Sequence, residues 1–165
     1  MAELRSDGGA LRFALALVAR ESDPGPPGGG AQGAASRGRL LVTAGIEYLD
    51  RRDGEWWPVV RLPPARVPVE AIERLLGDQA ALLDGSSSGF AWRPDDEAAL
   101  ALQLGLAPNG AVVEIGLDLG PFLAEWGGAP VRRDAELALF RLRAGQADLV
   151  RFSDALAREL EVLRR

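Results

Sequence analysis

Apolar residues recur at every second position in several separate stretches, and this alternation constrains the fold more than any other feature. Successive side chains of a β-strand point to opposite faces, so the pattern is typical of strands with one face on a core. The clearest case is two stretches joined by a Pro-Asn-Gly turn, with alternating apolar positions at Leu100, Leu102, Leu104 and Leu106, then Val113, Ile115, Leu117 and Leu119. They predict an antiparallel hairpin at the centre of a sheet.

Other alternating stretches predict further strands on either side of this hairpin. These are Leu11–Leu17, Arg39–Leu49, Glu55–Leu62, Phe90–Arg93 and Ala135–Arg143. Asp53 and Gly54 form a turn signal between the second and third of them. Pro58 cannot donate to a ladder, so we expect its strand at a sheet edge, or at a bulge as the less favoured alternative. We expect Pro63, Pro64 and Pro68 to end this run of strands and to open a helix.

Two stretches have the three-to-four spacing of amphipathic helices. The first is Val69–Leu83, followed by Gly85 as a left-handed C-cap residue, and the second is Gln146–Arg165. The expected order is β-β-β-α-β-β-β-β-α. Parallel strands would need a crossover helix after nearly every strand, so the sequence predicts an α+β fold with an antiparallel sheet of about six or seven strands.

The length of 165 residues predicts a single domain over residues 1–165. Residues 22–37 read SDPGPPGGGAQGAASR, which predicts a flexible Gly/Pro-rich loop between two strands. A phosphate-binding interpretation of this loop fails, because neither a GxGxxG spacing nor a following helix start is present.

Three residue types are missing, and their absence removes most catalytic chemistry. The chain has no cysteine, histidine or lysine, and its 19 basic residues are all arginine. Thiolate and imidazole catalysis, Schiff bases and common zinc sites are therefore excluded within this chain. We expect no enzyme activity, no cofactor and no metal. The arginine bias itself is best explained by a GC-rich genome.

The charge pattern argues against nucleic-acid binding. The formal net charge is -5, and the basic residues are spread along the chain instead of forming a stripe. No apolar stretch approaches the length of a membrane span, and the first residues lack the features of a signal peptide. We therefore expect a cytoplasmic protein that binds neither nucleic acid nor membrane.

Carboxylates give only a weak catalytic signal. The densest cluster, Asp95–Glu97, is best explained as a solvated turn, and it does not match a calcium-loop pattern. Glu114 and Asp118 fall on the solvent-facing side of their predicted strand, while Glu125 lies elsewhere. No spacing enforces the cleft that a carboxylate pair needs.

Aromatic and arginine residues supply the candidates for partner binding. Trp56 and Trp57 are adjacent on a strand, so their rings must point to opposite faces, and one of them can face a partner. The favoured alternative is that the second ring packs under a loop or the C-terminal helix. Trp126 lies in the stretch 121–131, which is predicted to be a loop or a single helical turn. Arg132 and Arg133 could bind an acidic partner, although a charged rim is the simpler interpretation.

The order of elements resembles that of WapI-type bacterial immunity proteins and related bacterial families. The resemblance is carried by "EWWPVVRL", "VEAIERLLGDQAALLDG", "ALALQLGLAPNGAVVEIGLDL" and "DLVRFSDALARELEVL". The insertion at 22–37 departs from the pattern. The resemblance implies a protein that neutralises a toxin by stoichiometric binding. We also consider an adaptor or structural subunit of a larger bacterial complex, and, as the least favoured alternative, a metal-dependent hydrolase that uses carboxylates.

Overall fold

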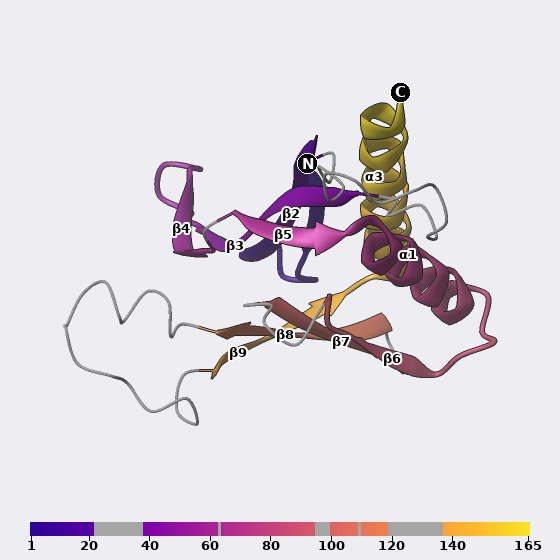
Figure 1. The fold of residues 1–165 in the computed structure, drawn as a ribbon. Coiled ribbons are helices and arrows are strands. Elements are labelled where there is room, and N and C mark those ends of the chain that lie inside the picture. Colours follow the sequence, from indigo (N-terminus) through magenta and orange to yellow (C-terminus); the bar gives the residue numbers. More distant parts are fainter. Residues whose placement is uncertain (22–37, 63, 95–99, 109, 119–136) are drawn as a thin grey trace, which may run out of the picture.

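The computed structural model describes residues 1–21, 38–62, 64–94, 100–108, 110–118 and 137–165. Its strands form two antiparallel sheets of five and four strands, and its helices complete an α+β fold as expected (Figure 1). The first sheet contains β1 (Ala2–Arg5), β2 (Leu11–Glu21), β3 (Arg39–Leu49), β4 (Trp56–Arg61) and β5 (Ala65–Pro68). The second contains β6 (Gly89–Trp92), β7 (Leu100–Ala107), β8 (Gly110–Asp118) and β9 (Leu137–Ala144). The described helices are α1 (Val69–Leu83) and α3 (Gln146–Arg164).

The two sheets face each other, and both helices lie at one side of the molecule (Figure 1). α1 connects the sheets, and α3 packs against β1 and β2 of the first sheet. The expected order of elements is confirmed in outline, with two short strands added and the strands divided between two sheets. β1 and β5 are the two strands that were not predicted.

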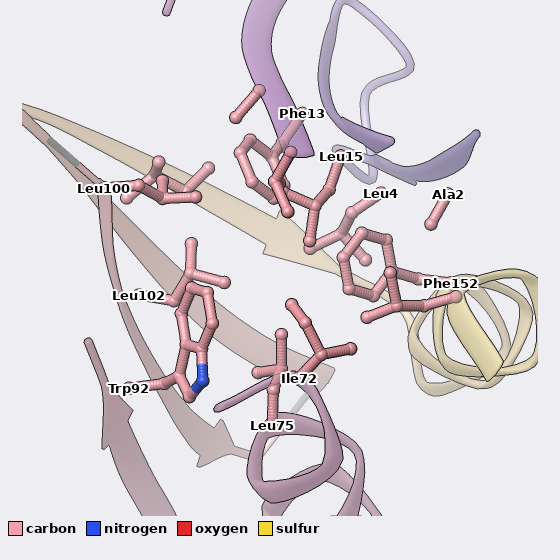
Figure 2. Close-up of a cluster of buried hydrophobic side chains, with 14 of the residues drawn as sticks. Ala2, Leu4, Phe13, Leu15, Ile72, Leu75, Trp92, Leu100, Leu102 and Phe152 are labelled. Carbon is pink, nitrogen blue, oxygen red and sulfur yellow. The ribbon is translucent and has the colours of Figure 1, made fainter. Parts of the chain in front are cut away.

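A single buried cluster joins both sheets and both helices. Figure 2 shows apolar side chains from all four regions pointing toward one another. Phe13 of β2 and Phe152 of α3 have ring centroids 6.1 Å apart. Trp92 of β6 is only 1% exposed, and its indole N–H donates a 2.6 Å hydrogen bond to the carbonyl of Ala71 on α1. This bond satisfies the one polar group of a ring that otherwise fills the core.

The long hairpin predicted around Gly110 forms β7 and β8, which are the two central strands of the second sheet. Gly110 has a φ of 133°, and a Cβ there would lie 2.8 Å from the carbonyl oxygen of Ala144. Only glycine fits this position. Gly85 follows α1 with a φ of 81°, as expected for a left-handed C-cap residue.

The sheet does not end near residue 63, contrary to expectation. β4 and β5 lie one after the other along the same side of β3, and β5 continues up to Pro68, where α1 begins. Pro58 lies in β4, which is an edge strand, and the register shift leaves Val59 as an extra residue beside it. Edge and bulge therefore occur together.

Candidate partner-binding surface

The β3–β4 hairpin projects from the side of the molecule opposite the helices (Figure 1). Its turn is closed by the amide of Asp50, which donates to the carbonyl of Glu55 at 2.9 Å, and by the amide of Gly54, which donates back to Asp50 at 2.8 Å. The pairing that follows places Tyr48 opposite Trp57. We call the side chains of Tyr48, Trp56, Trp57 and Val59 the hairpin end.

The rings of Trp56 and Trp57 lie on opposite faces of the sheet, as adjacent strand positions require. Trp57 shares its face with Tyr48, and both rings are largely in solvent, with exposed fractions of 48% and 43%. Ile46, two positions before Tyr48 on the same face, is fully buried. The core therefore ends between these two positions, and the face beyond it is aromatic and uncovered.

Trp56 is half-buried on the outer face, where it packs on cations and not in the core. The guanidinium of Arg12 lies 4.3 Å from its ring centroid, and that of Arg5 lies 5.7 Å away. Both distances fall within the range of cation–π attraction. Contacts within the chain thus fix the ring, so binding would cost it little further conformational entropy.

Ion pairs hold Arg12 under this ring. Its Nε donates to Oε2 of Glu47 at 2.6 Å, and its Nη1 donates to Oε1 of Glu3 at 3.1 Å. Arg61 donates to the second oxygen of Glu47 at 3.3 Å. The side chains of Arg12 and Glu47 are only 16% and 12% exposed, so solvent screens their attraction less than it would on an open surface.

A hollow of about 510 Å³ lies on the same outer face. Small side chains form its floor, and charges of both signs border it, from Arg12, Glu47 and Arg61. The small residues of the floor are Ala14, Ala16, Thr43 and Gly45. The lining contains carboxylate, guanidinium and hydroxyl groups but no side chain with the basicity of imidazole. These groups can make complementary polar contacts with a bound surface.

The remaining sequence candidates lie apart from the hairpin end or outside the described residues. Glu114 on β8 is bonded to Arg141 on the neighbouring strand, with Nε and Oε1 2.8 Å apart. The positions outside the described residues are the 22–37 loop, Asp95–Glu97, Glu125, Trp126, Arg132 and Arg133.

Sequence reasoning did not single out Tyr48, Val59, Arg12 or Glu47. Tyr48 continues the alternation of the buried face, so nothing local signals its exposure. Arg12 and Glu47 meet because β2 and β3 pair in that register, and they are 35 residues apart in the chain. The register between two strands that are distant in the chain cannot be predicted from the sequence of either strand alone.

Within the described ranges, no three histidine, cysteine or acidic side chains are grouped so that they could hold a metal ion. Hydrogen bonds from Ser86, first from its side chain and then from its backbone, lower the pKa of Asp84. Asp84 caps the end of α1, far from β4 (Figure 1). This perturbed group therefore belongs to the helix end and not to the hairpin end.

No described helix has the length and apolar character needed to cross a lipid bilayer. No family model matches the chain, and comparisons with curated proteins and with solved structures give no significant match.

Proposed function

We propose that this chain is a non-catalytic protein-binding module of the bacterial cytoplasm, and most concretely an immunity protein that neutralises a toxin by stoichiometric binding. The hairpin end is its contact surface. The observation that carries the proposal is the pair of exposed rings, Tyr48 and Trp57, directly opposite each other where the buried face runs out.

The composition of the hairpin end is that of an interface centre. Tryptophan, tyrosine and arginine are the residues most often found where truncation costs most in binding, whereas isolated exposed apolar residues are ordinary. Here Tyr48 and Trp57 are paired on one face, and Trp56 packs on Arg12 on the other. Val59, 48% exposed at the bulge, adds an exposed aliphatic side chain to the same hairpin.

The mechanism would be occlusion. A rigid hairpin that inserts into a concavity of a partner presents rings on two faces, so both walls of that concavity can be contacted. Such binding needs no proton transfer, which agrees with a chain that lacks histidine, cysteine and lysine.

Affinity capture in the native host tests this proposal. Wild-type protein, Trp57→Ser and a control, Val162→Ser, are used in parallel. Val162 lies on α3 and is 68% exposed, so the control also removes an exposed apolar side chain. The captured partner is then purified and titrated by calorimetry. We expect one partner per chain and about 30-fold weaker binding for Trp57→Ser, which corresponds to about 2 kcal/mol.

Toxicity assays decide the finer assignment. Co-expression of the chain should rescue cells from the captured partner, and Trp57→Ser should not. A partner that is harmless to cells would replace the immunity role with that of an adaptor. If all three proteins captured the partner equally well, the hairpin end would not be the contact surface.

A further inference from the structure

The edges of the two sheets differ in how well they are protected against pairing with another strand. Within the described residues, β1 and β6 are edge strands of only four residues each, and α3 packs against β1. β4 carries Pro58 and a bulge. Short length, proline and bulges are the usual ways of blunting an edge. β9 has none of them: it runs for eight residues, LALFRLRA, without glycine or proline.

Among the described residues, no strand lies beside the first part of β9 on the side away from β8. The amide of Asp7 donates a 2.7 Å hydrogen bond to the carbonyl of Arg143, so that carbonyl points away from β8. Main-chain groups of an antiparallel strand alternate in direction, and those of Leu139 and Arg141 must point the same way. In the part of the chain that the structure describes, these two residues have no partner on that side.

The side chains along this part of β9 are apolar or, in the case of Arg141, have a long aliphatic stem. Leu139 is 68% exposed, and Arg141, with a side chain 70% exposed, lies on the same outer face. Phe140 points to the opposite face and is half-buried against the core. Free amides and carbonyls beside exposed leucine are a template for strand addition.

We infer that β9 pairs antiparallel with β9 of a second copy of this chain, about a two-fold axis at Phe140. Leu139 of each copy then lies opposite Arg141 of the other. The two pairs together form about four main-chain hydrogen bonds. The four-stranded sheets of the two copies become one continuous sheet, and the rings of Phe140 face each other across the axis.

The charge pattern favours a second copy in this register. Each Arg141 faces a leucine, so its aliphatic stem packs on that side chain while its guanidinium stays with Glu114 of its own chain. A register centred on Arg141 would place two like charges opposite each other, which destabilises a strand pair. The Asp7 bond at Arg143 ends the open edge and limits the pairing to the first part of β9.

Symmetry also favours a second copy of this chain as the partner of β9. Two identical open edges satisfy each other reciprocally, and a two-fold axis leaves neither of them free, so the assembly stops at a dimer. A foreign strand would need an unpaired edge or tail of its own in the matching register.

Sedimentation equilibrium and light scattering over a range of protein concentrations test this inference. We expect the wild-type mass to approach twice the 17.5 kDa of one chain. Leu139→Pro should be monomeric, because it removes an amide that would bond to the second copy. This amide points away from β8, so the ladder within the chain is kept. Leu139→Lys should weaken the dimer at least tenfold. Val162→Lys changes an equally exposed residue on α3 and should leave the dimer intact.

Cross-linking tests the register, since the chain has no cysteine of its own. Under mild oxidation, Phe140→Cys should form a covalent dimer, because two residues facing each other on the axis are close enough for a disulfide. Leu139→Cys places the two sulfurs further apart and should cross-link less. Circular dichroism confirms that each variant is folded. A wild-type protein that is monomeric at every concentration, or a dimer indifferent to both Leu139 variants, would overturn the inference.

Discussion

Trp92 and Trp57 show two opposite uses of the same residue type. Trp92 lies between the second sheet and α1, is 1% exposed, and has its indole N–H bonded to Ala71. Trp57 lies at the end of a hairpin, is 48% exposed, and faces Tyr48. The first ring contributes its surface to the stability of the fold. The second leaves much of its surface to solvent, where a partner can use it. Substitutions in the two regions should therefore separate stability from binding.

The largest effect is expected at Trp92. Trp92→Ala should lower the free energy of unfolding by about 3 to 5 kcal/mol, because it leaves a cavity and removes the hydrogen bond to the Ala71 carbonyl. Urea denaturation followed by circular dichroism measures this change. Trp92→Phe keeps part of the ring volume and should lose less. If Trp92→Ala lost less stability than Trp57→Ser, the assignment of Trp92 to the core and Trp57 to the surface would be wrong.

An intermediate effect is expected at Arg12 of β2, which packs under Trp56 of the hairpin end. Arg12→Ala should lower the free energy of unfolding by about 2 kcal/mol, since Glu47 then loses its principal charged hydrogen-bond donor at a poorly exposed site. Arg165→Ala is the control, because Arg165 pairs with Glu161 in solvent and should change stability little. Equal effects at the two arginines would mean that burial of the network does not matter.

A smaller change of opposite sign is expected at Gln79, a polar residue inside the core. Gln79 on α1 is 2% exposed, and among the described residues neither atom of its amide has a hydrogen-bond partner. Gln79→Met keeps the length of the side chain and should raise the free energy of unfolding by about 1 to 2 kcal/mol. Gln146→Met, at an exposed site, is the control. Destabilisation by Gln79→Met would indicate that the amide is satisfied by water.

The sequence predicted most of the fold because the signals were local. Alternation of apolar residues located β2, β3, β7 and β8, and helical spacing located α1 and α3. Pro58 correctly indicated an edge strand. The division into two sheets was not predicted, because the sequence does not show whether the strands after α1 continue the first sheet or begin a second one. The interruption near residue 63 was also misjudged, since the sheet continues after it, where β5 pairs with β3.

The surface was less predictable than the fold for the same physical reason. Adjacent tryptophans on a strand guaranteed rings on opposite faces, but not which face would be covered. That outcome depends on where the second sheet and the helices lie, as the contrast between Ile46 and Tyr48 shows. Likewise, the stacking of Trp56 on Arg12 requires the pairing of β2, β3 and β4 in a particular register.

The smallest change in stability is expected at Trp57, where the effect on binding should be largest. Trp57→Ser should alter the free energy of unfolding by no more than about 0.5 kcal/mol, because the ring already lies largely in water. Urea denaturation of Trp57→Ser and Tyr48→Ser, each alone and together, measures this. If the rings support the hairpin through their mutual contact, the double variant will lose less than the sum of the single variants. Additive and small losses would assign both rings to the surface, whereas a loss near that of Trp92→Ala would assign Trp57 to the core.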